Sequence, residues 1–435
     1  MRILLCGDTL GITQLLANVS TKDIVGIIAA SIRPQYVTEL TSIAEKAKVP
    51  IFIQPKWRSI DYVEFKRQII EISPDIILIN SYSMIIREDI LSIPRFGGLN
   101  IHTALLPRNR GCNPTQWAIL NKEFETGVTL HEIDSGLDTG PIVDQIKIPI
   151  YFQDTWVDIR GREAQATNDL LKSNLPQILS GSWQAVPQKN KNASTSRRRT
   201  PKDGEFFWSE KIVDIHNKIR ALVPPLPPTY YLRKDGKKVE YDKYLTPWEI
   251  TSLKYDPEVG GGSMKTGRIN LRPLTKSYSR LLFKWITDRD LVRFNSSYFP
   301  VSESDHEVWI ERMMRKHSDL VIFVVEEKKE KKAIGTCQLF NINWVHRNAE
   351  LQIRIGEKEN EGKSYGSEAV RLICEFGFED LSLHRIFLQV LADNDKEIKL
   401  YQECGFILEG TQQEAAFVDG QWKDVVFMGK LAGNE

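Results

Sequence analysis

Three polar residues whose types suit carbonyl chemistry lie within one stretch of the chain, residues 97–143: Asn100, His102 and Asp138. Carbonyl transfer needs a donor for a developing oxyanion, a titratable ring and a carboxylate that tunes the ring. Taken singly, His102 could be a hydrogen-bonded core histidine and Asp138 a turn aspartate. Their occurrence together, among glycine, proline and arginine residues, predicts an active site.

The surrounding sequence predicts the elements that position them. Residues 99–102 form a short predicted strand, so the side chains of Asn100 and His102 point to the same face. Four further apolar runs predict buried strands with helical segments between them: residues 2–6, 23–30, 50–53 and 75–80. This alternation predicts an α/β fold with a doubly wound parallel sheet, in which ligands gather at the carboxyl ends of the strands. Since no G-x-G-x-x-G is present, the turn after the first strand is interpreted as a tight strand-to-helix turn.

The composition is that of a soluble globular protein of two or three domains: 435 residues, 41% hydrophobic and 26% charged, with a net charge of +1. This charge gives no support for broad nucleic-acid or membrane binding, and residues 197–199 are either a local basic patch or a solvated loop. Five dispersed cysteines form no Cys-x-x-Cys pair and no metal spacing, so no metal is expected. Without a signal-peptide pattern or an apolar run of about 18 residues, the sequence predicts a cytoplasmic protein.

Two motifs resemble the formyltransferase family that uses N10-formyltetrahydrofolate. They are N-I-H-x-x-L-L-P-x-x-R-G at residues 100–111 and G-V-T-L-H-x-I-D-x-G-x-D-T-G-P-I at residues 127–142. The resemblance covers about residues 1–235 and implies a Rossmann-like domain. It implies that Asn100 and an imidazolium at His102 stabilise the oxyanion and that Asp138 orients His102. It also implies a folate pocket along residues 81–86 and 136–138, formed among others by Ser81, Met84, Ile86 and Gly136.

The residues that follow the first motif bear on the acceptor. Asn113-Pro-x-x-Trp117-Ala and the segment 198–208 resemble the nucleotide-sugar branch of the family, whereas the methionyl-tRNA branch carries a sizeable basic C-terminal barrel. The resemblance therefore implies a nucleotide-linked amino sugar as acceptor, with methionyl-tRNA or a peptide amine as the alternative. Arg108, Arg110 and Trp117 are candidate substrate-binding residues, because arginine suits phosphate and an aromatic ring suits a base or a sugar face. The alternative for each is a structural role in its loop.

The chain changes character at Gly260-Gly-Gly-Ser263, directly before Met264. Three glycines and a serine predict a flexible linker, from either a natural fusion or an engineered joining of two chains. We therefore expect a formyltransferase catalytic domain over residues 1–187, a short C-terminal subdomain over 188–259, the linker over 260–263 and a second domain over 264–435.

The second domain has candidate residues of its own. Several predicted strands, followed by alternating strands and helices, indicate a mixed sheet with helices on both faces. A glycine-bearing turn at residues 362–367 leads into a predicted helix over 364–379. Its free backbone N–H groups could bind an anion, although glycine turns before helices are common. Farther on, Asn394 falls near the start of a predicted helix and Tyr401 about two turns into it.

Residues 265–432 resemble the GNAT-family N-acetyltransferases, especially the branch that acts on ribosomal-protein N-termini and amino sugars. The family signature R/Q-x-x-G-x-G/A is imperfect here, since Glu359 and Ser364 occupy its first and last positions. The resemblance implies that backbone amides of the turn bind the pyrophosphate of acetyl-CoA: Gly362, Lys363, Ser364, Tyr365, Gly366 and Ser367. It also implies that Asn394 contacts the pantetheine or its flanking backbone and that Tyr401 protonates the departing thiolate. Backbone donors of Ile353 and Ile355 are expected to meet the thioester carbonyl.

Glu350 is the candidate base for the incoming ammonium, with a surface strand carboxylate as the alternative. Core packing is the alternative role for Tyr401. The whole sequence predicts a bifunctional transferase that formylates a nucleotide-linked amino sugar and acetylates an amine of the same substrate class. The alternative from another class of function is a catalytically silent second domain used as a scaffold. We expect a small-molecule partner, no membrane and no nucleic acid, and a homo-oligomer is compatible with the sequence.

Overall fold

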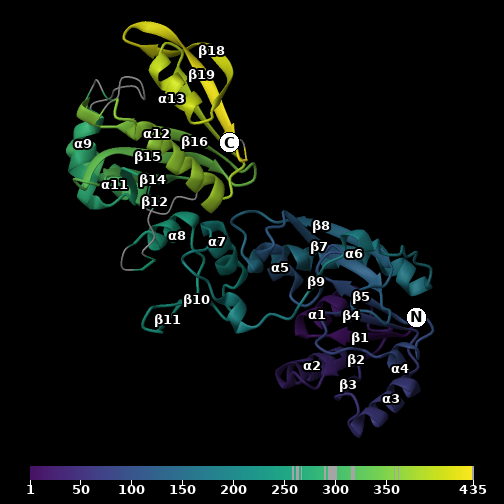
Figure 1. Cartoon of the computed structure of the whole chain (residues 1–435). Helices are drawn as coiled ribbons and strands as arrows, with labels where there is room; N and C mark the ends of the chain where they lie inside the picture. The colour runs from purple at the N-terminus through teal and green to yellow at the C-terminus, as the bar shows by residue number, and fades with distance from the viewer. Residues whose placement is uncertain are drawn as a thin grey trace. The chain divides into compact units, whose positions relative to one another are not determined.

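The computed structural model of the chain describes residues 1–256, 259–260, 264–265, 267–288, 291, 301–314, 319–356, 358–360 and 362–433. Packing divides the chain into two compact units (Figure 1). Unit 1 comprises Met1–Gly204 and Arg220–Pro227, and unit 2 comprises Glu205–Ile219 and Pro228–Glu435. Of the predicted linker, residues 261–263 lie outside the described residues. The domain limits at residues 187, 259 and 263 stay predictions.

The core of unit 1 is a seven-stranded sheet in the order β3-β2-β1-β4-β5-β7-β8. Its strands are β1 Ile3–Gly7, β2 Ile24–Ala30, β3 Ile51–Gln54, β4 Ile76–Asn80, β5 Gly98–His102, β7 Glu125–Glu132 and β8 Ile142–Pro149. Strands β1 to β5 run parallel, which confirms the predicted doubly wound sheet, and β7 and β8 add an antiparallel edge. The strand order reverses between β1 and β4, and ligands of such sheets bind near this reversal.

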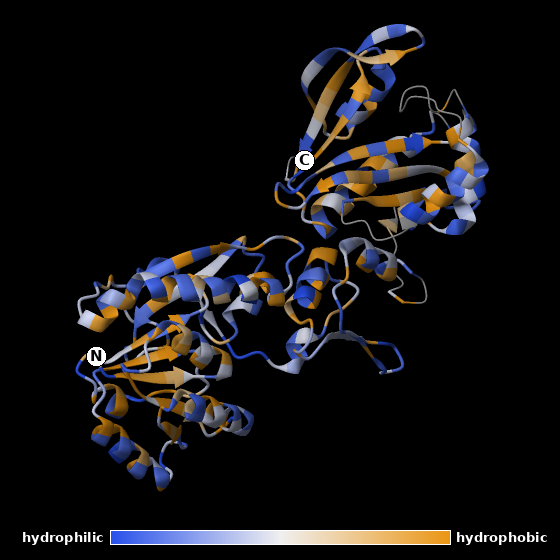
Figure 2. Cartoon of the chain, turned by 180° about the vertical axis from the view of Figure 1, so that it is seen from behind, coloured by the Kyte–Doolittle hydropathy of each residue, from blue (hydrophilic) through white to orange (hydrophobic). Residues whose placement is uncertain are grey.

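Helices cover both faces of this sheet, which explains why its central strands are continuous apolar runs. They are α1 Thr9–Asn18, α2 Pro34–Ala47, α3 Asp61–Ile72, α4 Glu88–Leu91, α5 Pro114–Leu120 and α6 Trp156–Ser180. Leu5 packs in one hydrophobic cluster with residues of α1, α2 and α6, whereas Leu4 and Cys6 pack in another with residues of α3 and α4. Figure 2 shows the strands near the N-terminus in nearly continuous orange.

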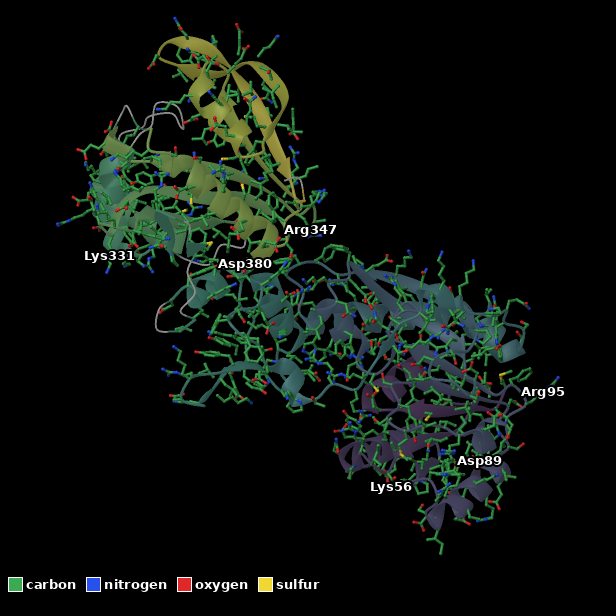
Figure 3. All side chains as sticks on the ribbon, viewed as in Figure 1. Lys56, Asp89, Arg95, Lys331, Arg347 and Asp380 are labelled. Atoms are coloured by element: carbon green, nitrogen blue, oxygen red, sulfur yellow. The ribbon has the colours of Figure 1, made fainter. Side chains whose placement is uncertain are left out.

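Shorter elements follow α6, which begins at a capping box of Thr155 and Asp158. They are η1 Asn190–Asn192, β9 Thr195–Ser196, η2 Pro201–Gly204, α7 Ile212–Ala221, β10 Thr229–Leu232, β11 Lys238–Tyr241 and α8 Pro247–Lys254. Strand β9 pairs with β6, Arg110–Gly111, and so ties a distant segment to the first motif. Within unit 2, Lys254 of α8 lies 2.5 Å from the carboxylate of Asp380, which is labelled in Figure 3.

The core of unit 2 is an eight-stranded sheet in the order β12-β13-β14-β15-β16-β17-β19-β18. Its strands are β12 Met264–Lys265, β13 Ile269–Pro273, β14 Val321–Glu327, β15 Lys332–Asn343, β16 Asn348–Ile355, β17 Arg385–Leu391, β18 Ile407–Val418 and β19 Gln421–Leu431. Every neighbouring pair is antiparallel except β16 and β17, so the sheet is mixed, as predicted. Strand β18 was not predicted, because its residues are mostly exposed and show no clear apolar alternation.

Helices lie on both faces of the second sheet. They are η3 Lys276–Tyr278, α9 Ser279–Thr287, α11 Glu303–Met314, η4 Lys358–Asn360, α12 Tyr365–Glu375, η5 Phe376–Asp380 and α13 Asp395–Glu403. Thr336 and Gln338 of β15 face α9 and α11, while Cys337 between them is buried on the opposite side. In the described ranges of the chain, no helix combines the length and the apolar character needed to cross a membrane.

Candidate active sites

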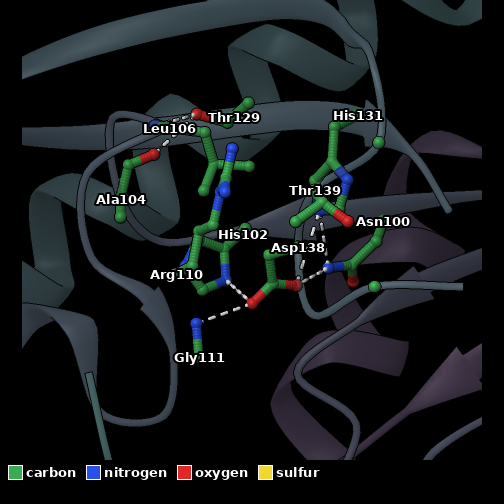
Figure 4. A network of polar contacts seen from close by, with 12 residues as sticks. Asn100, His102, Ala104, Leu106, Arg110, Gly111, Thr129, His131, Asp138 and Thr139 are labelled. Atoms are coloured by element: carbon green, nitrogen blue, oxygen red, sulfur yellow. Dashed lines mark hydrogen bonds and ion pairs between the residues drawn. The ribbon is translucent and has the colours of Figure 1, made fainter. Parts of the chain in front are cut away.

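Asn100, His102 and Asp138 converge at the carboxyl end of β5 (Figure 4). Asn100 and His102 project from the same face of β5, and Asp138 approaches them from the loop between β7 and β8. Asp138 Oδ2 lies 3.7 Å from His102 Nδ1, and Asn100 Nδ2 donates to Asp138 Oδ1 at 3.5 Å. The fold therefore brings together an amide and a carboxylate that are 38 positions apart in the sequence.

Two contacts hold Asp138 in place. The Gly111 N–H donates to Asp138 Oδ2 at 2.8 Å. The Gln188 side chain donates to the carbonyl oxygens of Asp138 and Gly140, at 2.9 and 2.7 Å. Gly111 has a φ of +99°, and a Cβ there would lie 2.5 Å from the Ser196 carbonyl oxygen, so the bridge between β6 and β9 requires glycine. The carboxylate is thus fixed from two directions.

The neighbours of the buried His102 ring define its tautomer. Its Nε2 donates to the carbonyl oxygen of Asn109 at 2.9 Å, because a carbonyl can only accept. Its Nδ1 faces the Asp138 carboxylate. The Nε2 of the ring therefore has a hydrogen-bond acceptor, and its Nδ1 lies 3.7 Å from a carboxylate.

A second histidine, His131, completes the network and was not among the predicted site residues. It lies directly opposite Asn100 in the antiparallel pair of β5 and β7. Its Nδ1 donates to the Glu132 carbonyl at 2.7 Å, which leaves Nε2 to accept from the Asn100 amide at 3.0 Å. Burial lowers the pKa of His131, so the ring stays neutral and keeps this acceptor. His131 thereby fixes the direction of the Asn100 amide.

Unit 2 contains a second convergence of predicted residues, at the N-terminus of α12. Gly362 and Ser364 have φ values of +75° and +62°, so the chain curls tightly before the helix begins at Tyr365. Among the residues that the structure describes, none would lie within 4 Å of a Cβ at Gly362. The first N–H groups of a helix, here those of Tyr365, Gly366 and Ser367, have no intrahelical acceptor. An anion site at this turn stays a prediction.

Strands β16 and β17 part in the middle of the same sheet. In the part of the chain that the structure describes, they pair only over Asn348–Glu350, although β16 continues to Ile355. The Gly356 N–H donates to the Ile334 carbonyl of β15 at 2.8 Å. Because N–H groups alternate in direction along a strand, those of Ile353 and Ile355 point to the β17 side. The opening between the strands therefore presents backbone donors.

Glu350 and Tyr401 lie on different elements of this unit. Glu350 is the last residue of β16 that pairs with β17, and its carboxylate accepts from Gln389 at 3.0 Å and from Asn341 at 3.2 Å. Tyr401 of α13 is 6% exposed, and burial raises the pKa of its phenol well above the ordinary value. Asn394 caps the same helix through its side chain. Glu350 thus marks the point where the strands part.

Comparison with known proteins identifies both halves of the chain. Residues 3–175 match the sequence profile of the formyl transferase family, and residues 268–407 match that of the acetyltransferase (GNAT) domain. The chain joins a formyl transferase domain to a GNAT acetyltransferase domain.

Individual proteins resemble one half or the other. The bifunctional polymyxin resistance protein ArnA of Wigglesworthia glossinidia brevipalpis is 34% identical over 218 residues, which are 49% of this chain and 33% of that protein. This chain therefore spans about a third of that relative's length. A sugar N-formyltransferase from Shewanella sp FDAARGOS_354 is 21% identical, covering 56% of this chain and 97% of that one, with a TM-score of 0.48. Spermidine N-acetyltransferase from Vibrio cholerae, solved with CoA and spermine, is 30% identical, covering 38% and 96%, with a TM-score of 0.36.

The residues predicted to line a folate pocket have different surroundings in the formyl transferase domain. Ser81 directly follows β4, beside the end of β5, and its carbonyl accepts the Asp8 N–H at 2.9 Å. Met84 is half-buried, and Gly136 lies in the same loop as Asp138. The side chain of Ile86 is buried in the hydrophobic cluster with α3 and α4. Only the backbone of Ile86 is therefore left for a ligand.

Arg108 and Arg110 have partners inside unit 1. The buried guanidinium of Arg110 donates to Gln188 at 2.7 Å and to Asn190 at 3.0 Å. Arg108 donates to Glu125 at 2.9 Å and is half exposed. Because Gln188 also donates to the carbonyl oxygen of Asp138, Arg110 helps to position the loop that carries Asp138. Substrate binding by either arginine stays a prediction.

Trp117 belongs to a basic cluster with Arg197 and Arg199. Their guanidinium groups lie 5.3 and 5.7 Å from the centre of its ring. Arg197 is paired with Asp203, whereas Nε and Nη1 of Arg199 are buried without a hydrogen-bond partner in the described chain. Burial lowers the pKa of Arg199 accordingly. Unpaired guanidinium donors of this kind suit an anionic ligand.

Proposed function

We propose that the chain is a bifunctional transferase. Its N-terminal half moves a formyl group from N10-formyltetrahydrofolate to the amine of a nucleotide-linked amino sugar, and its C-terminal half moves an acetyl group from acetyl-CoA to an amine. The network of Asn100, His102 and Asp138 at the end of β5 is the observation that carries the first activity. The opening between β16 and β17, with the free helix end of α12, supports the second.

In the N-terminal half, the bound folate would supply an activated formyl group. His102, as an imidazolium held by Asn109 and Asp138, places positive charge beside the oxygen on which negative charge develops. The Asn100 amide has one N–H fixed on His131, while its contact with Asp138, at 3.5 Å, is at the long limit of a hydrogen bond. The second N–H of Asn100 is therefore the donor available to that oxygen. Asp138 accepts the proton of the attacking amine through water.

Replacing His131 with phenylalanine is expected to lower the kcat of formyl transfer about 100-fold, because the Asn100 amide loses the acceptor that orients it. Since His131 acts through Asn100, the variant His131→Asn, which keeps an acceptor, should recover part of the rate. Steady-state kinetics of formyl transfer would measure both, with thermal unfolding as the test of folding. An unchanged kcat in a folded His131→Phe variant would show that His131 has no positioning role.

The basic cluster at Trp117 supports a nucleotide-linked acceptor. Strand β9 precedes the cluster and pairs with Gly111, whose N–H contacts the Asp138 carboxylate. The cluster is therefore connected directly to the catalytic loop. A guanidinium binds phosphate, and an aromatic ring binds a base or a sugar face. A tRNA acceptor would need a broad basic surface, and a net charge of +1 gives no support for one.

Replacing Arg199 with glutamine is expected to raise the KM for a nucleotide-linked acceptor about 10-fold or more and to leave kcat nearly unchanged, since a charge-assisted contact to phosphate is lost. Initial-rate kinetics with varied acceptor would measure it. Arg95→Gln is the matched control, because Arg95 is an exposed arginine of the same domain (labelled in Figure 3). Equal KM values for the Arg199→Gln and Arg95→Gln variants would show that the Trp117 cluster does not bind phosphate.

In the C-terminal half, the bound acetyl-CoA would supply an activated acetyl group. The backbone amides at the start of α12 would bind its pyrophosphate, and those of Ile353 and Ile355 would face the thioester. The phenol of Tyr401 carries its proton at neutral pH, as phenols do, and is the group proposed to protonate the departing thiolate. Glu350 accepts the proton of the incoming ammonium at the point where the strands part.

Mass spectrometry of product mixtures tests the proposal. The full chain is incubated with each donor separately and with amino-sugar nucleotides, methionyl-tRNA and a peptide with a free N-terminus. Formylation of an amino-sugar nucleotide and acetylation of an amine are the expected results. Formylation confined to tRNA or to the peptide would overturn the proposed acceptor. The absence of acetyl-CoA binding in calorimetry would favour a silent scaffold for the second domain.

A further inference from the structure

A cavity of about 200 Å³ lies in the GNAT domain between α9 and α11 and the facing side of β14, β15 and β16. The sheet contributes the polar lining residues Thr336, Gln338, Gln352 and Arg354. The helices contribute the aromatic lining residues Trp285, His306 and Trp309. Thr336 is opposite Arg354 in the strand register, and Gln338 is opposite Gln352, so these four side chains form one patch. The described lining contains no aspartate and no glutamate.

The guanidinium of Arg354 has no counter-ion in the described chain. Its Nε is buried without a hydrogen-bond partner, and no carboxylate lines the cavity that it faces. Burial lowers the pKa of Arg354, since desolvation disfavours the charged form. In contrast, Arg272 of β13 lies 3.3 Å from the carboxylate of Glu326. A half-buried cation without a partner is costly, and an anion that entered the cavity would offset that cost.

The other lining residues add neutral donors and flat rings. The Gln338 amide donates to Gln352 at 2.6 Å, which leaves the N–H groups of Gln352 for a ligand. His306 donates through Nε2 to a backbone carbonyl, and burial lowers the pKa of His306, so the ring contributes no charge. Trp285 packs directly on Gly356, where a Cβ would lie 2.1 Å from the ring. Trp rings suit the face of a sugar or a base.

The cavity adjoins the atoms that would take part in acetyl transfer. Arg354 lies between Ile353 and Ile355, whose N–H groups point into the opening between β16 and β17. Glu350 shares the face of Arg354, because alternate residues of a strand point the same way. A molecule whose amine reaches Glu350 can therefore place another group at Arg354.

We propose that the acetyl acceptor of the GNAT domain carries an oxyanion, a phosphate or a carboxylate, that binds to Arg354. This inference rests on the proposed acetyltransferase function. The planar guanidinium binds either oxyanion through two parallel hydrogen bonds. A volume of about 200 Å³ is below the range of about 300–1,000 Å³ that encloses drug-sized ligands, so the cavity suits one sugar ring or one amino acid. A polyamine, whose charges are all positive, is repelled by Arg354.

The test compares acetyl transfer by the full chain to four amines: glucosamine, glucosamine 6-phosphate, 2-amino-2-deoxyglucuronate and spermidine. The expected kcat/KM is at least about 10-fold higher for one of the two anionic sugars than for glucosamine, and lowest for spermidine. Which of the two is preferred distinguishes phosphate from carboxylate. Arg354→Gln should raise the KM for the preferred acceptor about 10- to 100-fold and leave that for glucosamine unchanged. Arg354→Lys should fall between, because it keeps the charge and loses the planar fork.

Arg280→Gln is the matched control, because Arg280 is an exposed residue of α9. It should leave every KM unchanged, and acetyl-CoA binding measured by calorimetry should be the same in all variants. A wild-type preference for spermidine, or equal KM values for charged and neutral sugars in wild type and Arg354→Gln, would overturn the anionic acceptor while the acetyltransferase function stands. A chain that binds no acetyl-CoA would overturn that function and this inference with it.

Discussion

Replacing Asp138 with asparagine is expected to lower formyl transfer about 1,000-fold with little change in stability. Asparagine has the same size and can still accept the Gly111 N–H, so the change removes mainly the negative charge. That charge lies 3.7 Å from both His102 Nδ1 and His131 Nε2. Its loss deprives the His102 imidazolium of its counter-ion and the attacking amine of its proton acceptor, and such groups contribute about 10²- to 10⁴-fold. Single-turnover formyl transfer at saturating donor would measure the effect.

Asp134→Asn is the matched control for this prediction. Asp134 lies in the same loop and accepts from the Gly136 N–H and the Thr139 hydroxyl, both of which an asparagine oxygen can also satisfy. Its replacement is expected to change the rate less than about 3-fold. If the Asp138→Asn variant were as active as the Asp134→Asn variant, the charge of Asp138 would have no part in catalysis.

Replacing Tyr401 with phenylalanine is expected to lower acetyl transfer about 100- to 1,000-fold and to leave the affinity for acetyl-CoA unchanged. The phenylalanine ring preserves the contact with Phe406, whose ring centroid is 5.9 Å from that of Tyr401, and removes only the hydroxyl. The departing thiolate then lacks a proton donor. Rapid-quench kinetics would measure the transfer, and calorimetry would measure acetyl-CoA binding.

The same variant separates catalysis from core packing. If Tyr401 only fills the core, the phenylalanine variant keeps the wild-type kcat. Tyr241→Phe serves as a control, because burial also raises the pKa of Tyr241, to about 12, although it lies in the hairpin before α8. Equal rates for the Tyr401→Phe and Tyr241→Phe variants would show that Tyr401 serves only in packing and that another group protonates the thiolate.

The parts of the fold that were predictable are those in which burial leaves a clear pattern. Apolar runs in the sequence predicted β1 to β4, because strands covered by helices on both faces are apolar along their whole length. Strand β18 left no such pattern, because most of its side chains are exposed and it is held by backbone pairing with β19. The antiparallel direction of β7 and β8 depends on chain reversals that local sequence patterns do not determine.

In the formyl transferase site, too, contacts between residues close in the sequence were predictable, whereas contacts between distant residues were not. Asn100 and His102 share a strand face, which follows from a spacing of two. His131 lies 31 positions from Asn100 and contacts it because the two residues are opposite each other in the paired strands β5 and β7. The sequence motif does not determine that register. The partners of Arg110 come from the segment around Gln188, which is brought to the site by the pairing of β6 with β9 and by a bridge between Ile142 and Val186.

In the GNAT domain, the sequence pattern does not indicate a binding role for Arg354, for a related reason. An arginine among alternating residues of a strand has the pattern of a solvent-facing side chain. Its burial depends on α9 and α11, which pack over that face of the sheet and close the cavity. The sequence predicts Glu350 as a carboxylate on a strand. Its position at the point where β16 and β17 part is known only from the pairing of these two strands.

The proposed function requires two independent transferases on one chain. The most direct measurement is mass spectrometry of the products formed by wild type, Asp138→Asn and Tyr401→Phe, each supplied with both donors and an amino-sugar nucleotide. The Asp138→Asn variant should lose formyl product and keep acetyl product, and the Tyr401→Phe variant should do the reverse. Loss of both products in either variant, or of neither in both, would contradict the account.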